Sequence, residues 1–262
     1  MKVCVLASGS KGNCIYIENE GSALLVDLGI SYSRLLAALS DIGSEIGKIK
    51  GVLITHEHID HISGLSVFAK KNPLVPVCSH KKTLYAVDKR LGTSFCSLAR
   101  EDFESGFFLC GMEIQPFRIS HDAVCPVGYV VKNHDKKVAC VTDLGVVTPS
   151  VRSNVLGCNL AVLEFNHDSH MLSESVYPRS LKDRISGRLG HLSNEVAADF
   201  ATELIENGAK DIILAHLSED NNMPTLAKNT LLDRLARCGI CCDGLRIEPA
   251  MQQCHTVVYE VK

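Results

Sequence analysis

The chain has 262 residues, of which 46% are hydrophobic and 22% are charged, and its formal net charge is −3 at pH 7. This composition excludes an intrinsically disordered chain, and no run of about 18 apolar residues is long enough to cross a bilayer. With a net charge close to zero, a polyanionic partner would have to bind to a local basic patch. The N-terminal segment lacks the apolar stretch of a secretory signal, so we expect the protein in the cytoplasm and not at a membrane.

Short apolar segments alternate with turns through the first half of the chain. Strands are predicted where apolar and β-branched residues run together or alternate, at residues 3–7, 14–18, 23–27, 52–54, 112–119, 127–132 and 137–142. Leucines and other apolar residues at helical spacing predict helices at residues 33–39 and 65–70.

The last third of the chain continues this alternation. Ser193 suits the N-cap of a helix at residues 194–207, which Gly208 would end, and a buried strand is predicted at residues 211–215. No linker, charge block or repeat divides the sequence, so residues 1–262 are expected to form one α/β domain with helices covering its sheets. The pattern leaves the strand order open.

Twelve cysteines are scattered along the chain, and most lie in apolar stretches. Buried, reduced thiols are typical of this pattern in a cytosolic protein. Cys238 and Cys241 form one C-x-x-C motif, which a zinc knuckle would complement with a second pair at matching spacing. Because no such second pair is present, we expect inert thiols there.

The densest polar motif is H-x-H-x-D-H at residues 56–61, directly after the predicted strand that ends at residue 54. In extended backbone His56, His58 and Asp60 project to one side, whereas His58 and His61 become neighbours once a helical turn begins. A segment that passes from strand into helix can therefore serve two adjacent metal ions. Imidazole and carboxylate ligands without thiolates favour a catalytic site for Zn, Mn or Fe, and a solvated polar turn is the alternative.

Three later segments offer further ligands, each just past an apolar strand. They contain His121 with Asp122, then Asp143, and finally His216. A single polar residue at a strand end is usually a cap or a surface group. Its repetition behind the dense motif indicates that these side chains complete one site.

The motif, followed by His, Asp and His at ordered intervals, resembles the metallo-β-lactamase fold over nearly the whole chain. The resemblance implies a four-layer αββα sandwich with a dinuclear site at the open edge of its sheets, occupied by two divalent ions (Zn, Mn or Fe). Carried over by position, one ion would be held by His56, His58 and His121, the other by Asp60, His61 and His216, and Asp143 would bridge them.

Three further motifs narrow the resemblance to the YycJ/WalJ group of this superfamily. They are L-A-S-G-S-K-G-N-C at residues 6–14, E-F-N-H-D at residues 164–168 and G-H-L-S-N at residues 190–194. These proteins are regarded as nucleases, so the resemblance implies an exonuclease that acts 5′-to-3′ on DNA ends or single strands. Larger relatives insert a cap domain between the ligands carried here by Asp143 and His216, and this interval leaves no room for a domain of about 100 residues.

A second polar cluster favours a phosphodiester substrate. Two ions about 3.5–4 Å apart can activate water, neutralise the attacked phosphoryl group and stabilise the leaving oxygen. If residues 179–188 are helical, Arg184 and Arg188 share one face beside His191 and form a local cationic wall. An ordinary solvated helix face with ion pairs to carboxylates such as Asp183 is the alternative.

The remaining candidates surround the predicted metals. By resemblance, His191 would contact the scissile phosphate, and a histidine can also protonate the leaving oxygen. The predicted catalytic residues are His191 and Asp60. Glu164 is expected to orient a ligand histidine, with a strand cap as the alternative. A glycine-rich loop at residues 8–13 has the composition of an anion-binding loop. The predicted substrate contacts are His167, Arg184, Arg188, Ser10 and Asn13.

Two other function classes share parts of this pattern. A small-molecule hydrolase of the same fold, such as a cyclic phosphodiesterase, a lactonase or a thioester hydrolase, would use the same ligands. It would differ in salt dependence, because nucleic-acid binding weakens steeply as salt rises. A noncatalytic, metal-stabilised protein is disfavoured by the complete ligand set, and metal-dependent turnover would exclude it.

Overall fold

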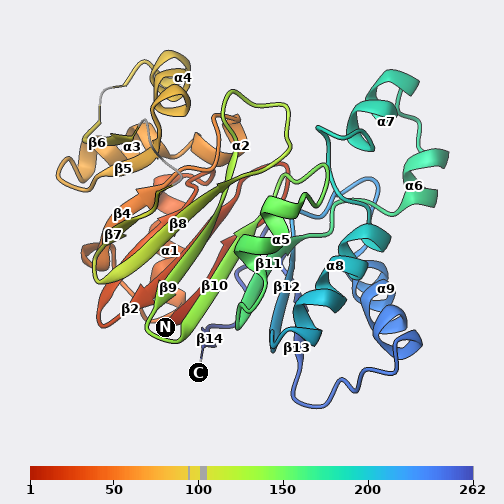
Figure 1. Ribbon diagram of the computed structural model, residues 1–262. Coiled ribbons are helices and arrows are strands. Elements are labelled where there is room, and N and C mark those ends of the chain that lie inside the picture. The colour runs from red at the N-terminus through yellow and green to blue at the C-terminus, as the bar shows by residue number, and fades with distance from the viewer. Residues whose placement is uncertain (94, 101–104, 262) are drawn as a thin grey trace.

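The computed structural model describes residues 1–93, 95–100 and 105–261, which form two β-sheets packed face to face between helices (Figure 1). The first sheet has the strand order β14-β1-β2-β3-β4-β5-β6. Its strands are β1 (Lys2–Ala7), β2 (Cys14–Asn19), β3 (Ser22–Val26), β4 (Ile49–Leu53), β5 (Val77–His80), β6 (Ser97–Arg100) and β14 (Tyr259–Glu260). The second sheet has the order β13-β12-β11-β10-β9-β8-β7. Its strands are β7 (Phe107–Leu109), β8 (Met112–Arg118), β9 (Val127–Asn133), β10 (Lys136–Val141), β11 (Leu160–Glu164), β12 (Asp211–Ala215) and β13 (Arg246–Pro249).

Helices cover the outer face of each sheet. The first sheet is covered by α1 (Tyr32–Asp41), α2 (Ile59–Ile62), α3 (Leu65–Lys71) and α4 (Lys81–Leu91), with a 3₁₀ turn η1 (Ile46–Lys48) before β4. The second sheet is covered by α5 (Pro149–Val155), α8 (Asn194–Glu206) and α9 (Pro224–Arg237). Two short helices, α6 (Ser169–Glu174) and α7 (Arg179–Ile185), stand apart from the sheets at the upper right of Figure 1.

Three apolar layers hold these elements together. The central layer joins the facing sides of the two sheets, for example Val5 of β1 and Val131 of β9. A second layer packs the first sheet against its helices through residues such as Phe68, and a third packs α5, α8 and α9 on the second sheet through residues such as Phe200. The predicted four-layer αββα sandwich is therefore confirmed.

The strand directions bring distant polar residues to one edge. Strands β3 to β6 pair in parallel, and so do β10 to β13. Since parallel strands end at the same edge of a sheet, the segments that follow β3, β4, β10, β11 and β12 meet there. Between β10 and β12 the chain forms only α5, β11, α6, α7 and α8, and it inserts no cap domain within this fully described interval.

The expectation of buried thiols is correct for half of the cysteines. All twelve are thiols outside any disulfide, and six of them are buried. Cys238, Cys241, Cys242 and Cys254 are exposed because they lie in the connections after α9 and β13, and Cys96 is exposed beside the edge strand β6. No helix among the described residues is long and apolar enough to cross a membrane.

Candidate metal centre

The histidine-rich motif follows β4 and turns into α2, as its spacing predicts. Residues 54–58 are not helical, His58 is the N-cap of α2, and the helix begins at Ile59. The turn is held against the first sheet because Asn13 N donates to Asp60 O at 2.8 Å and Leu28 N donates to His61 O at 2.8 Å. Gly29 permits this approach, since a Cβ there would overlap the Asp60 carbonyl oxygen.

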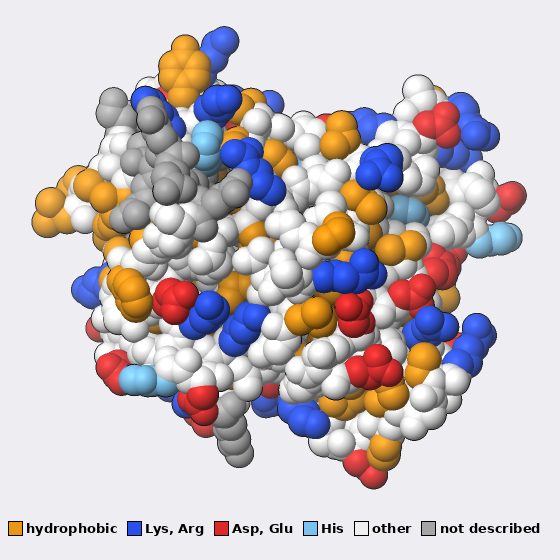
Figure 2. Space-filling view, in the orientation of Figure 1, with side chains coloured by type: hydrophobic (Ala, Val, Ile, Leu, Met, Phe, Trp, Pro, Cys, Tyr) orange, Lys and Arg blue, Asp and Glu red, His pale blue; other side chains and the backbone are white. Residues whose placement is uncertain are grey.

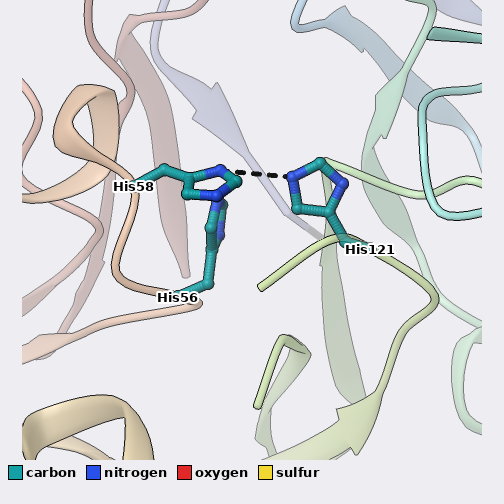
Figure 3. A group of neighbouring side chains, drawn as sticks. All are labelled: His56, His58 and His121. Atoms are coloured by element: carbon teal, nitrogen blue, oxygen red, sulfur yellow. Dashed lines mark hydrogen bonds between the residues drawn. The ribbon is translucent and has the colours of Figure 1, made fainter. Parts of the chain in front are cut away.

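Three histidines form the first group of side chains at the edge (Figure 3). His56 and His58 come from the turn after β4, and His121 comes from the loop after β8. Nε2 of His121 lies 3.3 Å from Nδ1 of His58, and the ring centroids of His56 and His121 are 5.0 Å apart. Nε2 of His56 is buried and has no hydrogen-bond partner among the described residues, so it is free to bind a cation.

A second group consists of Asp60, His61 and His216. Oδ2 of Asp60 lies 3.3 Å from Nε2 of His61 and 3.6 Å from Nε2 of His216. The Nε2 atom of His216 is also buried without a hydrogen-bond partner in the described part of the chain. Both groups offer one ligand atom per residue within 4.8 Å of one another, which suits binding of a metal ion to each.

Asp143 lies between the two groups and is almost completely buried. Its Oδ2 atom is 3.3 Å from Nε2 of His61, while Oδ1 is 3.5 Å from Nε2 of His216 and 3.7 Å from Nε2 of His121. Burial alone would raise the pKa of Asp143, but the surrounding histidines, His216 and His61 foremost, hold it well below its usual range. An ionised carboxylate that faces both groups suits a bridge between two cations.

Backbone strain marks the strand ends that carry these residues. Asp27, Asp143 and His216 have φ values of 61°, 57° and 55°, in the left-handed region that most side chains avoid. Such conformations persist where the surrounding structure fixes them, and they gather at functional sites. Here these left-handed conformations let the chain turn sharply after β3, β10 and β12.

A carboxylate that the sequence interpretation missed supports the second group. Oδ2 of Asp27 lies 2.7 Å from Nδ1 of His61 and accepts a 2.8 Å hydrogen bond from Oγ1 of Thr55. Oγ1 of Thr55 also lies 2.9 Å from Nδ1 of His56. Asp27 therefore fixes the ring orientation of His61 and leaves Nε2 facing the centre, as carboxylates behind metal-bound histidines do. The available signal was its position as an acidic residue at the end of an apolar strand.

Glu164, at the end of β11, joins three segments of the edge. Its carboxylate accepts from the backbone N–H groups of Asp143, Leu144 and Leu192 at 2.9 to 3.1 Å. Oε1 also lies 3.1 Å from Nδ1 of His216 and 2.9 Å from Nδ1 of His191. Burial would raise its pKa, but His191 and His216 lower it to about 2.

The charges of the two histidines beside Glu164 follow from the same contacts. Burial would lower the pKa of His216, but Asp143, Asp60 and Glu164 raise it to about 10. Burial would also lower the pKa of His191, and Glu164 reverses that effect and raises it. In contrast, burial lowers the pKa of His56 well below its usual value, so that ring stays neutral.

His191 is partly exposed, with 20% of its side chain accessible, whereas 5% of the His216 side chain is accessible. Its Nδ1 atom faces Glu164 and lies 3.9 Å from Oδ1 of Asp143. It shares a potential ligand group with Asp143, Glu164 and His216, so its geometry suits either an ion or the substrate.

The structure differs from the cationic wall that the sequence predicts on a helix at residues 179–188. Helix α7 ends at Ile185, so Arg184 and Arg188 do not share one helical face. The chain turns back because Gly190 packs against the carbonyl groups of residues 184 and 185, where a Cβ would overlap them, and His191 N donates to Ile185 O at 2.8 Å. Arg184 instead pairs with Asp122 at 2.7 Å.

The other predicted substrate contacts occupy different surroundings. His167 is buried beside α6, Ser10 is exposed in the loop after β1, and Arg188 is exposed beside Gly190. Asn13 is engaged in the centre itself: its Nδ2 atom lies 3.2 Å from Oδ2 of Asp60 and 3.1 Å from Nε2 of His61. Its Oδ1 atom accepts from Gly9 N at 2.9 Å.

The sequence profile of the Metallo-beta-lactamase superfamily matches residues 7–216 of the chain. The exodeoxyribonuclease YycJ of Bacillus anthracis is 40% identical over 226 residues, which cover 86% of this chain and 85% of that protein. The exodeoxyribonuclease WalJ of Streptococcus pneumoniae serotype 2 is 37% identical over 240 residues, which cover 90% of this chain and 88% of that protein.

Solved structures share the fold at low sequence identity. The metallo-beta-lactamase fold protein YhfI of Bacillus subtilis superposes with a TM-score of 0.71 at 15% identity, covering 99% of this chain and 100% of that one. The short form of human tRNase Z gives a TM-score of 0.66 at 17% identity and covers the whole of both chains. These likenesses establish the arrangement of the sheets and helices.

Proposed function

The chain belongs to the metallo-beta-lactamase superfamily, and from this we propose that it is a metal-dependent phosphodiesterase that degrades DNA from an end. The observation that carries the proposal is Asp143, which faces two ligand groups at once. The homology of the chain to exodeoxyribonucleases over most of its length supports a nucleic-acid substrate. The proposed polarity, 5′-to-3′, and the preference for DNA ends or single strands rest on the resemblance of the sequence motifs to a group of nucleases.

Seven side chains would hold two divalent ions, Zn, Mn or Fe, in this proposal. The first ion would bind His56, His58 and His121, the second would bind Asp60, His61 and His216, and Asp143 would contact both. The orphaned nitrogens of His56 and His216 and the orphaned Oδ2 of Asp143 fit such ions, because buried polar atoms otherwise have partners. Two ions in this position supply Lewis-acid activation of a phosphoryl group and of the attacking water.

Asp60 is proposed to position the attacking water. Its carboxylate is 18% exposed, while its Oδ2 atom is fixed by Nδ2 of Asn13 at 3.2 Å. Burial would raise its pKa, but His61 and His216 lower it, so the carboxylate stays ionised and accepts hydrogen bonds at neutral pH. An ionised acceptor at the opening can orient a water molecule toward phosphorus.

His191 is proposed to act on the leaving side of the phosphate. Glu164 faces Nδ1 and raises the pKa of the ring, which favours the protonated form of His191, and that form can donate a proton from Nε2 to the leaving oxygen. Glu164 would thereby position both His191 and His216 through a single carboxylate oxygen.

A digestion series tests this function against the small-molecule alternative. End-labelled single-stranded DNA, duplex DNA, RNA and a small chromogenic phosphodiester are incubated with the metal-supplemented protein at increasing salt. We expect release of nucleotides from DNA ends, with binding that weakens as salt rises. Salt-insensitive hydrolysis of the small diester alone would favour a small-molecule hydrolase, and degradation of RNA alone would overturn the DNA assignment.

A further inference from the structure

A cavity of about 460 Å³ lies at the two short helices that stand apart from the sheets. Its walls include His167, Leu172 and Ser173 from the β11–α6 segment, and Arg179 and Lys182 from α7. Figure 2 shows Lys and Arg side chains at the upper right, over the end of the molecule where Figure 1 places these helices. The volume lies within the range of about 300–1,000 Å³ that is usual for small-ligand sites.

The cavity adjoins the segments that carry the proposed catalytic groups. His167 follows Glu164 by three residues, and its carbonyl accepts from Asn194 N at 2.8 Å. His167 also pairs as a parallel bridge with Ser193, two residues after His191. The wall of the cavity is therefore continuous with the backbone that positions Glu164 and His191.

His167 has unused hydrogen-bonding capacity. The residue is 2% exposed, and its Nδ1 atom is buried without a partner in the described part of the chain. Burial lowers the pKa of His167, so its ring is neutral and offers one donor and one acceptor. Because buried polar atoms normally have a partner, this nitrogen is an unsatisfied polar group in a residue of the cavity wall.

The remaining walls combine charge with apolar surface. Arg179 and Lys182 contribute two positive charges, and Asp183 contributes one negative charge. Nε of Arg179 donates to Oδ1 of Asp183 at 2.8 Å. Lys182 Nζ uses one donor on the carbonyl of Ser173 and retains others for an anion. Leu172 and the ring of Tyr177 supply apolar surface. Cations beside an apolar wall suit a phosphate joined to a sugar and a base.

We propose that this cavity binds the terminal nucleotide of the strand being cut. The inference rests on the proposed nuclease function and explains why that activity would begin at an end. A terminal nucleotide held there would leave the next phosphodiester linkage toward the segments of Glu164 and His191, to which the wall of the cavity is joined through His167, Ser193 and Asn194. The free mononucleotide is then the product that leaves the cavity.

Two tryptophan substitutions on exposed serines test the proposal. Ser173 lines the cavity, and Ser180 is an exposed residue of α7 outside its lining, so Ser173→Trp fills the cavity while Ser180→Trp is the matched control. Binding of 2′-deoxyadenosine 5′-monophosphate to the metal-loaded protein is measured by calorimetry. We expect Ser173→Trp to weaken binding by about tenfold or more and Ser180→Trp to leave it within about twofold. Thermal melting checks that both variants are folded.

Exonuclease kinetics on the same variants separate this proposal from the function itself. We expect Ser173→Trp to raise KM for single-stranded DNA with hydrolysis of a small chromogenic diester unchanged, as loss of a binding contact predicts. Equal nucleotide affinity and equal DNA KM in Ser173→Trp and Ser180→Trp, with wild-type DNA cleavage intact, would overturn the cavity assignment alone. Nucleotide binding that depends on Ser173 in a protein that cuts no nucleic acid would support the cavity and overturn the proposed function.

Discussion

Oδ2 of Asp27 lies 2.7 Å from Nδ1 of His61, which makes a residue at the end of β3 responsible for the orientation of a histidine in α2. Both groups are almost completely buried. The opposite ring nitrogen of His61 lies 3.3 Å from Asp60 and from Asp143. A carboxylate at this distance selects the tautomer in which Nε2 carries no proton, so Asp27 orients a proposed metal ligand without facing the ion.

Asp27→Asn is therefore expected to weaken binding of one metal ion by about 10–100-fold. The amide keeps the size of the side chain, but its NH₂ group cannot accept from both Thr55 and His61 at the Oδ2 position. Metal titration followed by elemental analysis measures the effect. Asp41→Asn, at the exposed end of α1, is the control, and equal metal content in both variants would contradict the assignment.

The protein is expected to bind two divalent ions per chain after reconstitution, and Asp143→Ala is expected to lose both. The reason is that Asp143 faces histidines assigned to both ions, whereas every other proposed ligand is assigned to one ion. Elemental analysis of the purified protein gives the stoichiometry. His134→Ala, in the exposed turn between β9 and β10, should retain both ions. Well under one ion per reconstituted wild-type chain would reject a dinuclear centre.

His191→Ala is expected to retain its metals and to lose about 10²–10⁴-fold in phosphodiesterase rate, the usual contribution of a general acid. This expectation rests on the partial exposure of His191 and on the contact of its Nδ1 atom with Glu164. Metal content and rate are measured on the same preparation. Loss of an ion would make His191 a ligand and reopen the assignment of His216, while an unchanged rate with both ions bound would show that the ring has a structural role.

Much of this site could be predicted because its signals are local. The H-x-H-x-D-H motif lies within one turn, and His121, Asp143 and His216 each follow a strong apolar strand, so the sequence pattern brings them to strand ends. The contact of Asp27 with His61 depends on the parallel pairing of β3 with β4, which periodicity does not reveal. Similarly, the end of α7 depends on the packing of Gly190 against a preceding turn, a contact that residue spacing along a helix does not encode.

A buried carboxylate away from the metal centre gives a pH prediction. Burial would raise the pKa of Glu18, but hydrogen bonds from Tyr16 and Lys48 lower it. A pKa that is lower in the folded state stabilises the protein above the ordinary glutamate value, and this stabilisation is lost as the pH falls through the folded value. Glu18→Gln should therefore be about 1 kcal/mol less stable at pH 7, with the difference shrinking in acid.

Urea denaturation of wild type and Glu18→Gln at pH 7 and near pH 3 tests this sign. Glu20→Gln, in the exposed turn between β2 and β3, serves as the control. A stability difference that grows as the pH falls would contradict the assigned direction of the shift.

Neutralising Arg184 and Arg188 together is expected to weaken binding to single-stranded DNA while leaving hydrolysis of a small diester nearly unchanged. Although they do not share a helical face, both are exposed; Arg184 lies in the last turn of α7, and Arg188 lies between α7 and His191. Arg184 also holds Asp122, the neighbour of His121, at 2.7 Å. We propose that the two arginines contact phosphates next to the cleaved one, and each such contact would steepen the fall of log affinity with log salt by about 0.7 on single strands.

The double variant Arg184→Gln and Arg188→Gln is compared with Arg237→Gln, at the exposed C-terminal end of α9. Binding to labelled single-stranded DNA is measured over a salt series, in parallel with turnover of the small diester. We expect a shallower salt slope only in the double variant, because a substrate with one phosphate never reaches these side chains. If small-diester turnover falls as much as DNA binding does, the ion pair between Arg184 and Asp122 supports the metal centre through His121, and the arginines act on the chemistry instead of on the polymer.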